Sequence, residues 1–483
     1  MAEDKLAPYR GKRDARRTPE PVPGAEGPLP AGNDDTFVIQ EHHARALHWD
    51  FRLERGGVLV SWAVPKGLPL DPKRNHLAVH TEDHPLEYAA FAGEIPAGEY
   101  GGGAVTIWDR GTYRAEKWTD SEVKVVLRGG RVSGRYVLFR TRGKDWMVHR
   151  MDPPPTPDWQ PLPELIRPMM ATAGTLPPPG AEDGRWAYEM KWDGVRAVVY
   201  VEGGRVRVMS RNDRDVTASY PELRELGESL GSTACVLDGE IVAFGPEGRP
   251  SFGALQQRMH VANAAQARRL AQQVPATLLL FDVLHLDGRS LVGLPWRERR
   301  KVLESLELDG PRWQTPPYFP GDGVSALATS SAQGLEGIVA KRVDSSYEPG
   351  RRSRAWVKVK NIRTQEVVVG GWKPGEGRRA ATIGSLLLGV MRGGELRYAG
   401  HVGTGFSDAV LRDLTSRVRR LERPGSPFAD EVPRKDAKDA RWVEPRLVGE
   451  VAYGEWTKDG RLRHPSWRGL RPDKSPEEAV SET

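Results

Sequence analysis

The spacing of hydrophobic and polar residues divides the chain into three parts. Residues 36–150 form short segments in which apolar and polar residues alternate, separated by Gly and Pro, and this pattern predicts a small β domain. Between residues 184 and 362, strand-like segments alternate with helical ones, which predicts an α+β domain. Short strands return between residues 363 and 475, with one helical stretch at 408–421. This last part suits a small β-barrel such as an oligonucleotide-binding (OB) fold.

The periodicity also predicts individual elements. In the middle part, strands are expected at 186–190, 196–201, 205–209, 236–244, 277–284, 337–341 and 356–360, and helices at 221–230 and 256–273. In the last part, strands are expected at 366–372, 385–391, 397–402 and 448–457.

Composition sets the boundaries. Residues 1–35 are rich in Pro, Gly and charge, which predicts a disordered tail, and residues 476–483 are expected to be a second one. Seven prolines between residues 152 and 168 predict an extended linker, so residues 151–183 are taken as linker and lead-in.

Charge and cysteine content narrow the protein class. Among 483 residues, 71 are Lys or Arg and 65 are Asp or Glu; the net charge of +6 is compatible with a nucleic-acid or nucleotide partner, and equally with a solvated mixed-charge surface. The single cysteine, Cys235, excludes an internal disulfide and a thiolate metal cluster. Residues 1–17 are polar and basic without an apolar core, so we expect no secretory signal, and no apolar run approaches the ~20 residues that span a bilayer. We therefore expect a soluble monomer in the cytoplasm, at the nucleoid, without a membrane partner.

Lys191 lies in the most informative stretch, Lys-x-Asp-Gly-x-Arg, which ends at Arg196. A lysine beside a tight turn can act as a nucleophile if desolvation and nearby cations lower its pKa. The alternative interpretation is a strand, a turn and a surface lysine.

Two further lysines, Lys358 and Lys360, alternate with valines and therefore face one way if the segment is a strand. Two lysines on one side of a buried strand are costly unless an anion lies there, and a nucleotide phosphate is the natural candidate. An edge strand with a solvated lysine face is the alternative.

The blocks Lys-x-Asp-Gly-x-Arg, Ser-Arg (210–211), Asp-Gly-Glu (238–240), Phe-Asp (281–282), Glu-Gly (336–337) and Lys-x-Lys (358–360) follow one another along the chain. In this order they resemble the ATP-dependent DNA ligases, over residues 184 to about 475. The resemblance implies ATP and Mg²⁺ or Mn²⁺ as cofactors and a lysyl-AMP intermediate on Lys191. It further implies that Phe281 stacks on adenine, that Arg211 and Glu240 contact the ribose and that Glu189 binds the nucleotide. Arg196 would contact the phosphate at the nick, and Glu336 would be a metal carboxylate. Lys358 and Lys360 would offset charge on the α-phosphate. A last motif, with Arg471, Asp473 and Lys474, would close over the ATP pyrophosphate.

Histidines gather in the first domain: six of the eleven lie between residues 42 and 84. If residues 48–53 form a strand, His48, Asp50 and Arg52 share one face and Trp49, Phe51 and Leu53 the other. His80, Glu82 and His84 alternate in the same way, so the two polar faces suggest one shared pocket.

Two histidines and a carboxylate, His42, His48 and Asp50, suit Mn²⁺, Fe²⁺ or Zn²⁺. A non-haem iron oxygenase site would use this set, whereas Arg52, Lys66 and Arg74 argue for a phosphate substrate. Half-buried structural histidines are the third possibility.

The segments 40–42, 47–54, 64–67, 82–88 and 95–101 resemble the 3′-phosphoesterase module of bacterial end-joining DNA ligases. The resemblance implies a small β-barrel with Mn²⁺ held by His42, His48 and Asp50. Arg52, His84 and Tyr88 would hold phosphate or stabilise the transition state, and Glu82 would support the site. His76 stands where the family usually has arginine, so phosphate binding is expected to be weaker or pH-dependent.

Together, the two resemblances predict a multidomain ATP-dependent DNA ligase that heals 3′ ends and acts on DNA ends and nicks in double-strand-break repair. A Ku-type end-binding partner and a separate polymerase are expected, since no room is left for a polymerase domain. The alternatives are an RNA ligase or capping-type nucleotidyltransferase, a ligase with an inactive N-terminal DNA-end-binding domain, and a DNA-end scaffold without activity.

Overall fold

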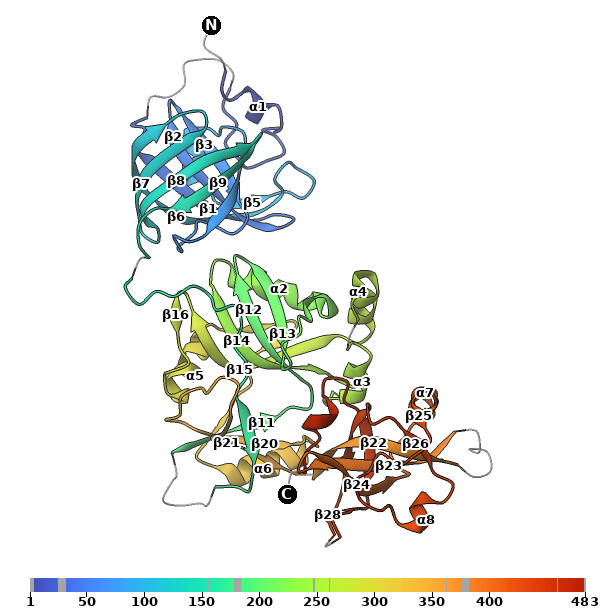
Figure 1. Ribbon diagram of the computed structural model, residues 1–483. Coiled ribbons are helices and arrows are strands. Elements are labelled where there is room, and N and C mark those ends of the chain that lie inside the picture. The colour runs from blue at the N-terminus through green and yellow to red at the C-terminus, as the bar shows by residue number, and fades with distance from the viewer. Residues whose placement is uncertain are drawn as a thin grey trace.

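The computed structural model describes residues 4–24, 32–154, 156–177, 184–245, 248–259, 261–361, 363–375, 382–457 and 459–481. Within them, three domains follow one another along the chain, which confirms the expected multidomain fold (Figure 1). Residues 1–3, 25–31 and 482–483 of the expected tails, and Pro155 and residues 178–183 of the expected linker, lie outside the described residues. No described helix is long and apolar enough to cross a membrane.

The N-terminal domain is a closed barrel. Within residues 32–154, eight antiparallel strands run in the order β1-β2-β3-β4-β9-β8-β7-β6, β6 pairs again with β1, and β5 adds to β6. The elements are β1 (Thr36–His43), β2 (Leu47–Arg55), β3 (Val58–Val64), β4 (Asn75–His80), the 3₁₀ helix η1 (Leu86–Ala90), β5 (Gly93–Ile95), β6 (Gly103–Trp118), β7 (Glu122–Gly129), β8 (Ser133–Arg142) and β9 (Asp145–Arg150).

The alternation along β2 determines what the barrel encloses. Trp49, Phe51 and Leu53 lie in the barrel core, as predicted. His48, Asp50 and Arg52 therefore lie on the opposite face of the strand, outside the core.

Residues 4–24 are not the loose tail that their composition predicts. They include α1 (Ala7–Arg10) and pack on the barrel, where Tyr9 is fully buried against Leu59 and Tyr88. The Tyr9 hydroxyl donates to the Pro21 carbonyl at 2.8 Å, which closes the segment on itself. The prediction was wrong because a few apolar side chains anchor a short segment when its charged residues find partners on a neighbouring domain. We call residues 4–24 the N-terminal strap.

The central domain consists of two sheets. One has the order β13-β12-β14-β15-β18-β17, with β16 on β15, and the other the order β10-β21-β20-β11-β19. Its strands are β10 (Met170–Ala173), β11 (Trp186–Lys191), β12 (Val195–Glu202), β13 (Arg205–Ser210), β14 (Cys235–Ala243), β15 (Ala276–Leu286), β16 (Arg289–Ser290), β17 (Asp309–Gly310), β18 (Trp313–Gln314), β19 (Phe319–Pro320), β20 (Gly337–Arg342) and β21 (Arg352–Lys360). Its helices are η2 (Thr217–Ser219), η3 (Pro221–Leu223), α2 (Arg224–Leu230), α3 (Phe252–Gln256), α4 (Ala264–Gln273), α5 (Trp296–Ser305) and α6 (Gly323–Ala332).

Strand β12 is buried on both faces, which explains its nearly continuous apolar sequence. Val199 and Val201 face the helices, whereas Val198 and Tyr200 pack against the second sheet. The helix expected at 256–273 is two helices, because Asn263 caps a new one by accepting a hydrogen bond from the Gln266 amide at 2.9 Å.

The expected linker is shorter than its prolines suggest. Strand β10, inside the range 151–183, pairs in parallel with β21 and belongs to the central domain. Before it, the Gln160 amide donates to the Gly288 carbonyl at 2.7 Å and the Ile166 amide to the Tyr200 hydroxyl at 2.6 Å. The proline-rich segment therefore packs along the central domain instead of extending freely.

The C-terminal domain is built mainly of strands around β22. The order is β24-β23-β22-β26-β25, and β27 pairs with both β22 and β30. The elements are β22 (Thr364–Pro374), β23 (Ile383–Arg392), β24 (Glu395–Val402), α7 (Asp408–Arg419), β25 (Glu422–Arg423), α8 (Arg434–Ala437), β26 (Arg441–Val443), β27 (Val448–Ala452), β28 (Glu455–Trp456), β29 (Leu462–Arg463), β30 (Ser466–Leu470) and η5 (Pro476–Glu478).

The expected C-terminal tail is also ordered as far as residue 481. Ala479 is buried against Val368 and Val448, and the Gln365 amide group donates to the Val480 carbonyl at 3.0 Å. The prediction of a disordered tail at residues 476–483 was wrong for residues 476–481, because one small apolar residue and a few hydrogen bonds hold this segment on β22 and β23.

Candidate active sites

A cavity of about 720 Å³ lies where both central sheets meet the C-terminal domain. Every residue that the sequence assigned to the nucleotide site lines it: Glu189, Lys191, Arg196, Arg211, Glu240, Phe281, Glu336, Lys358, Lys360, Arg471 and Lys474. These residues come from strands far apart in the sequence, so the fold gathers them in one place.

Lys191 ends β11 and lies opposite Gly337 of β20, which places Glu336 beside it. The Lys191 ammonium donates to the Glu336 carboxylate, and Lys360 Nζ lies 3.4 Å from the other carboxylate oxygen. A side chain at position 337 would collide with the Val359 carbonyl, so glycine allows β20 and β21 to bring Lys360 to Glu336.

The charge of Lys191 is stabilised. Burial alone would lower its pKa, but the carboxylates of Glu336, Asp193 and Glu240 outweigh burial and raise the pKa above its ordinary value. The charges of Lys191 and Lys360 in turn hold the pKa of Glu336 far below its usual range, against the effect of burial. In this arrangement the surroundings therefore raise the pKa of Lys191 and do not depress it.

Phe281 lies among cations and a second aromatic ring. The Lys341 ammonium is 4.5 Å from its ring centre and the Arg196 guanidinium 4.6 Å, and Trp356 makes an edge contact at 6.4 Å. Lys341 also pairs with Glu189 at 2.6 Å.

Arg196 makes a two-pronged ion pair with Asp238, at 2.6 and 2.7 Å. The pair occupies its guanidinium, so Arg196 supports the floor of the cavity beside Phe281.

Glu240 is a buried carboxyl on β14. Burial, opposed by Arg196 and Lys191, raises its pKa to about 7. Arg211, at the start of the loop after β13, pairs with Glu478 of the C-terminal domain at 3.1 Å.

The C-terminal domain closes the cavity through ion pairs. Arg468 bridges Asp193 of the central domain at 2.6 Å and Glu450 of β27 at 3.1 Å. Arg471 lies 3.5 Å from Glu450 and pairs with Asp473 at 2.8 Å, while Lys474 pairs with Glu366. These contacts place the last predicted motif over the cavity.

A second site lies on the outer face of the N-terminal barrel. Ligand atoms of His42, His48 and Asp50 all lie within 4.8 Å of one another. His42 Nε2 contacts the Gly101 carbonyl at 2.8 Å and His48 Nδ1 the Ala46 carbonyl at 3.0 Å. Because a carbonyl can only accept, each ring donates there, and its other nitrogen faces Asp50, at 3.4 and 3.7 Å. Two imidazole nitrogens and a carboxylate held this way fit a divalent metal.

The predicted phosphate-binding residues adjoin this set. Arg52 is buried and donates to Asp50 at 2.9 Å, to Ser61 at 2.9 Å and to Gln40 at 2.7 Å, and its guanidinium lies 4.7 Å from the Tyr88 ring centre. The His84 and Tyr88 rings meet edge to face at 4.8 Å. Burial, with the Arg52 and Arg13 charges, holds the pKa of His84 well below its usual range.

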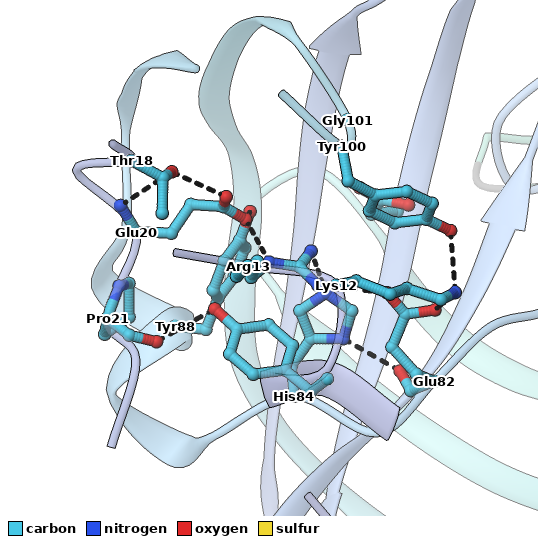
Figure 2. Close-up of polar contacts among 12 residues, drawn as sticks. Lys12, Arg13, Thr18, Glu20, Pro21, Glu82, His84, Tyr88, Tyr100 and Gly101 are labelled. Atoms are coloured by element: carbon cyan, nitrogen blue, oxygen red, sulfur yellow. Dashed lines mark hydrogen bonds and ion pairs between the residues drawn. The ribbon is translucent and has the colours of Figure 1, made fainter. Parts of the chain in front are cut away.

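The N-terminal strap reaches the same site (Figure 2). Arg13 pairs with Glu20 at 2.7 Å and with Glu82 at 3.1 Å, and lies 3.4 Å from His84 Nε2. The Tyr88 hydroxyl donates to Glu20 at 3.1 Å. Sequence reasoning placed these strap residues in a tail and did not include Arg13 and Glu20 in the site.

Comparisons with known proteins identify related domains. Residues 40–140 match the family described as the DNA Ligase D 3′-phosphoesterase domain. Residues 168–360 match the ATP dependent DNA ligase domain, and residues 379–474 match the ATP dependent DNA ligase C terminal region. "DNA ligase C1" of Mycolicibacterium smegmatis is 36% identical over 337 residues, 65% of this chain and 92% of the relative.

The chain belongs to the ATP-dependent DNA ligases. "Multifunctional non-homologous end joining protein LigD" of Mycobacterium bovis is 50% identical over 485 residues, covering 99% of the chain but 61% of the relative's length. The solved structure "mycobacterial DNA ligase D complexed with ATP and MES" has 45% identity and a TM-score of 0.51, over 65% of this chain and 98% of that one.

Several cavity residues of the ligase were missed from the sequence. Lys341, Asp193, Arg468 and Glu450 all make contacts in or over the cavity. Lys341 belongs to the block that begins at Glu336, and Asp193 to the lysine motif, so their positions carried a signal. Glu450, in an ordinary apolar strand, carried none.

Two histidines of the phosphoesterase domain lie apart from His42, His48 and Asp50, which we call the metal set. His80 packs against Trp62 and Trp146 at 5.4 and 6.2 Å, so the expectation that it shares the pocket with Glu82 and His84 is wrong. Strand β4 ends at His80, and the alternation does not continue beyond it. His76 contacts the Gly67 carbonyl at 2.8 Å, and burial lowers its pKa.

Proposed function

We propose that this ligase seals DNA breaks through a lysyl-AMP intermediate on Lys191 and that its N-terminal domain heals 3′ ends, in double-strand-break repair by end joining. The observation that supports the first part most directly is the gathering of all the predicted nucleotide-site residues around one cavity with Lys191 at its centre. The relatives named for non-homologous end joining support the second part. The chain spans 61% of the length of the relative from Mycobacterium bovis.

The reaction begins with Lys191. Its Nζ loses a proton and attacks the α-phosphorus of ATP; a P–N bond forms as the bond to the bridging oxygen breaks and pyrophosphate leaves. The adenylate then passes to a 5′-phosphate at the break, and attack by the 3′-hydroxyl releases AMP and joins the strands. Lys358 and Lys360 offset the charge that develops on the phosphate oxygens.

Divalent cations belong to both sites in this proposal. Glu336 would hold Mg²⁺ or Mn²⁺, and His42, His48 and Asp50 would hold Mn²⁺, where two imidazole nitrogens face the carboxylate. A cation polarises phosphate oxygens and, at Glu336, would also reduce the stabilisation of the Lys191 charge.

The other assignments follow from the same cavity. Phe281 would stack on adenine with Glu189 and Lys341 beside it, and Arg211 and Glu240 would contact the ribose. Arg471 and Lys474 would bind the pyrophosphate. We also propose that the protein works with a Ku-type end-binding protein and a separate polymerase activity, since joining needs ends that are held and filled.

The deciding experiment is covalent labelling with radioactive ATP, GTP and NAD side by side. Lys191→Ala is expected to abolish an acid-labile, alkali-stable AMP adduct that the wild type forms with ATP, because Lys191 carries the phosphoramidate in this mechanism. Lys301→Ala, an exposed lysine on α5, is the control and should label normally. Labelling of Lys191→Ala would show that the nucleophile is another residue, and a preference for GTP would favour a capping-type transferase.

The barrel is tested separately with a duplex that ends in a 3′-phosphate. His48→Ala removes one member of the metal set and is expected to reduce 3′-phosphate release by at least about a hundredfold, with sealing of a 3′-hydroxyl nick unchanged. Failure of the wild type to release phosphate with Mn²⁺ would favour an inactive, end-binding barrel.

A further inference from the structure

One end of the phosphoesterase barrel rests on the ligase domain (Figure 1). The Trp108 ring nitrogen donates to the Ser232 hydroxyl at 2.7 Å, just beyond α2. The hairpin turn between β12 and β13, Gly203–Gly204, approaches Lys66 and Leu47 so closely that a Cβ on Gly203 would lie 3.0 Å from Lys66 Cα.

The barrel residues in this contact adjoin the metal set. Trp49 of β2 pairs with Val64 of β3, and Ala63 of β3 pairs with Val79 of β4, so Leu47, Lys66 and His76 lie at the same end of the barrel. Leu47 is directly followed by His48, a member of the metal set.

One of the basic side chains at this end pairs with a carboxylate of the other domain. Arg74 Nη1 lies 3.3 and 3.4 Å from the two oxygens of Glu202, at the end of β12. Glu202 also acts on His76. Burial is the main cause that lowers the pKa of His76; Glu202 raises this pKa, and Lys66 and Arg74 lower it. A carboxylate that pairs with Arg74 and acts electrostatically on His76, which Lys66 also influences, takes a place that suits a phosphate group.

We propose that Lys66, Arg74 and His76 form a binding surface for a DNA backbone phosphate and that Glu202 on the β12–β13 hairpin occupies this surface when the two domains are docked. Docking and uptake of a DNA 3′ end by the barrel are then mutually exclusive. The ligase domain restrains end healing until DNA displaces the hairpin. This inference rests on the proposed phosphoesterase function and adds how access to that site is controlled.

The strength of the contact suits a reversible restraint. Arg74 and Glu202 are 41% and 35% exposed, and such pairs contribute about 0.2–1 kcal/mol, which corresponds to ~1.4–5-fold in affinity. Salt is expected to weaken both the pair and the binding of DNA phosphate.

A reversible lock tests the proposal. A Cβ built on Gly204 lies 3.2 Å from the Leu47 Cβ, close to the ~3.8 Å typical of disulfides, so Leu47→Cys with Gly204→Cys should cross-link the docked domains on oxidation. The only native cysteine, Cys235, is buried in the central core. The locked protein should release 3′-phosphate at least about fivefold more slowly than the same protein after reduction, while Lys191 adenylation stays within twofold.

Two single variants weaken the docking without a cross-link. Glu202→Gln removes the charge, and Gly203→Asn creates an Asn-Gly turn, which keeps the hairpin but adds a Cβ at the Lys66 contact. Both should raise 3′-phosphate release about two- to fivefold at low salt, an effect that should disappear at high salt. Glu225→Gln, an exposed carboxylate on α2, is the matched control and should change nothing.

A third measurement does not depend on catalysis. A photoreactive base at the 3′ end of a duplex should cross-link to residues 64–80 of the reduced protein and much less to the locked one. Equal cross-linking or equal activity in the two forms would overturn the proposal. If neither the reduced variant nor the wild type releases phosphate, but the disulfide still reduces cross-linking to DNA, only the phosphoesterase function would be refuted.

Discussion

At the scale of single residues, the cavity pairs a protonated lysine with carboxylates that hold its charge. Glu336 does this for Lys191, and Glu240 lies close enough to affect both Lys191 and Arg196. The motif could be predicted from the sequence, because its residues are consecutive. The electrostatic balance could not, because it depends on Glu336 and Glu240, which reach Lys191 only through the pairing of separate strands.

Glu240 gives a prediction about pH. Its pKa is about 7 against an ordinary value of 4.5, so between these values the folded protein keeps a proton that the unfolded chain has lost. The stability that this group contributes is therefore greatest below about pH 4.5 and falls as the pH rises through 7. A ribose hydroxyl, however, donates best to the ionised carboxylate, so ATP-dependent adenylation should increase as the pH rises from 6 to 8.

The measurement is the initial rate of Lys191 adenylation against pH at subsaturating ATP. Glu240→Gln should lower the rate and remove the increase centred near pH 7, and should make the protein's thermal midpoint less dependent on pH in the same range. An unchanged rise in the variant would assign that rise to another group.

At the scale of elements, predictions succeeded where the two-residue alternation of a strand determines which side chains face the core. They failed where contacts with residues distant in the sequence order a segment. The alternation along β2 gave both the barrel core and the polar face that carries His48 and Asp50. The N-terminal strap has no period, and its order depends on Tyr9 meeting Leu59 and Tyr88 far along the chain. Composition alone could not reveal such a contact.

The strap gives a prediction at this scale. Tyr9→Ala removes the buried ring that holds the strap. Large-to-small changes at such positions cost about 3–5 kcal/mol, which we expect to exceed the free energy that holds so short a segment on the barrel. The strap should detach, become sensitive to protease, and take Arg13 and Glu20 away from His84 and Tyr88. We expect 3′-phosphate release to fall at least tenfold while nick sealing is unchanged. Tyr9→Phe loses only the hydrogen bond to Pro21, about 1 kcal/mol, and should keep most of the activity.

At the scale of the whole molecule, the structure has the C-terminal domain closed on the central one. Arg468 joins Asp193, two residues from Lys191, to Glu450 of the C-terminal domain. Residues of three separate sequence regions therefore hold the closed arrangement, and neither domain's own sequence pattern indicates that they meet.

Closure should matter for one step of ligation. The bridge holds Arg471 and Lys474 over the cavity that contains Lys191, so Arg468→Ala should slow adenylation at least about tenfold, since an ion pair of this partly buried kind contributes on the order of 1.4 kcal/mol or more. A nick that already carries AMP on its 5′-phosphate does not need the lysine reaction, and we expect the variant to seal it at a rate close to wild type.

Arg446→Ala, an exposed arginine of the same domain, should leave both steps unchanged. The two steps are measured by single-turnover assays on the same preparations. Equal slowing of both in Arg468→Ala would mean that the bridge stabilises the fold or DNA binding in general, and not the closed arrangement that adenylates the lysine.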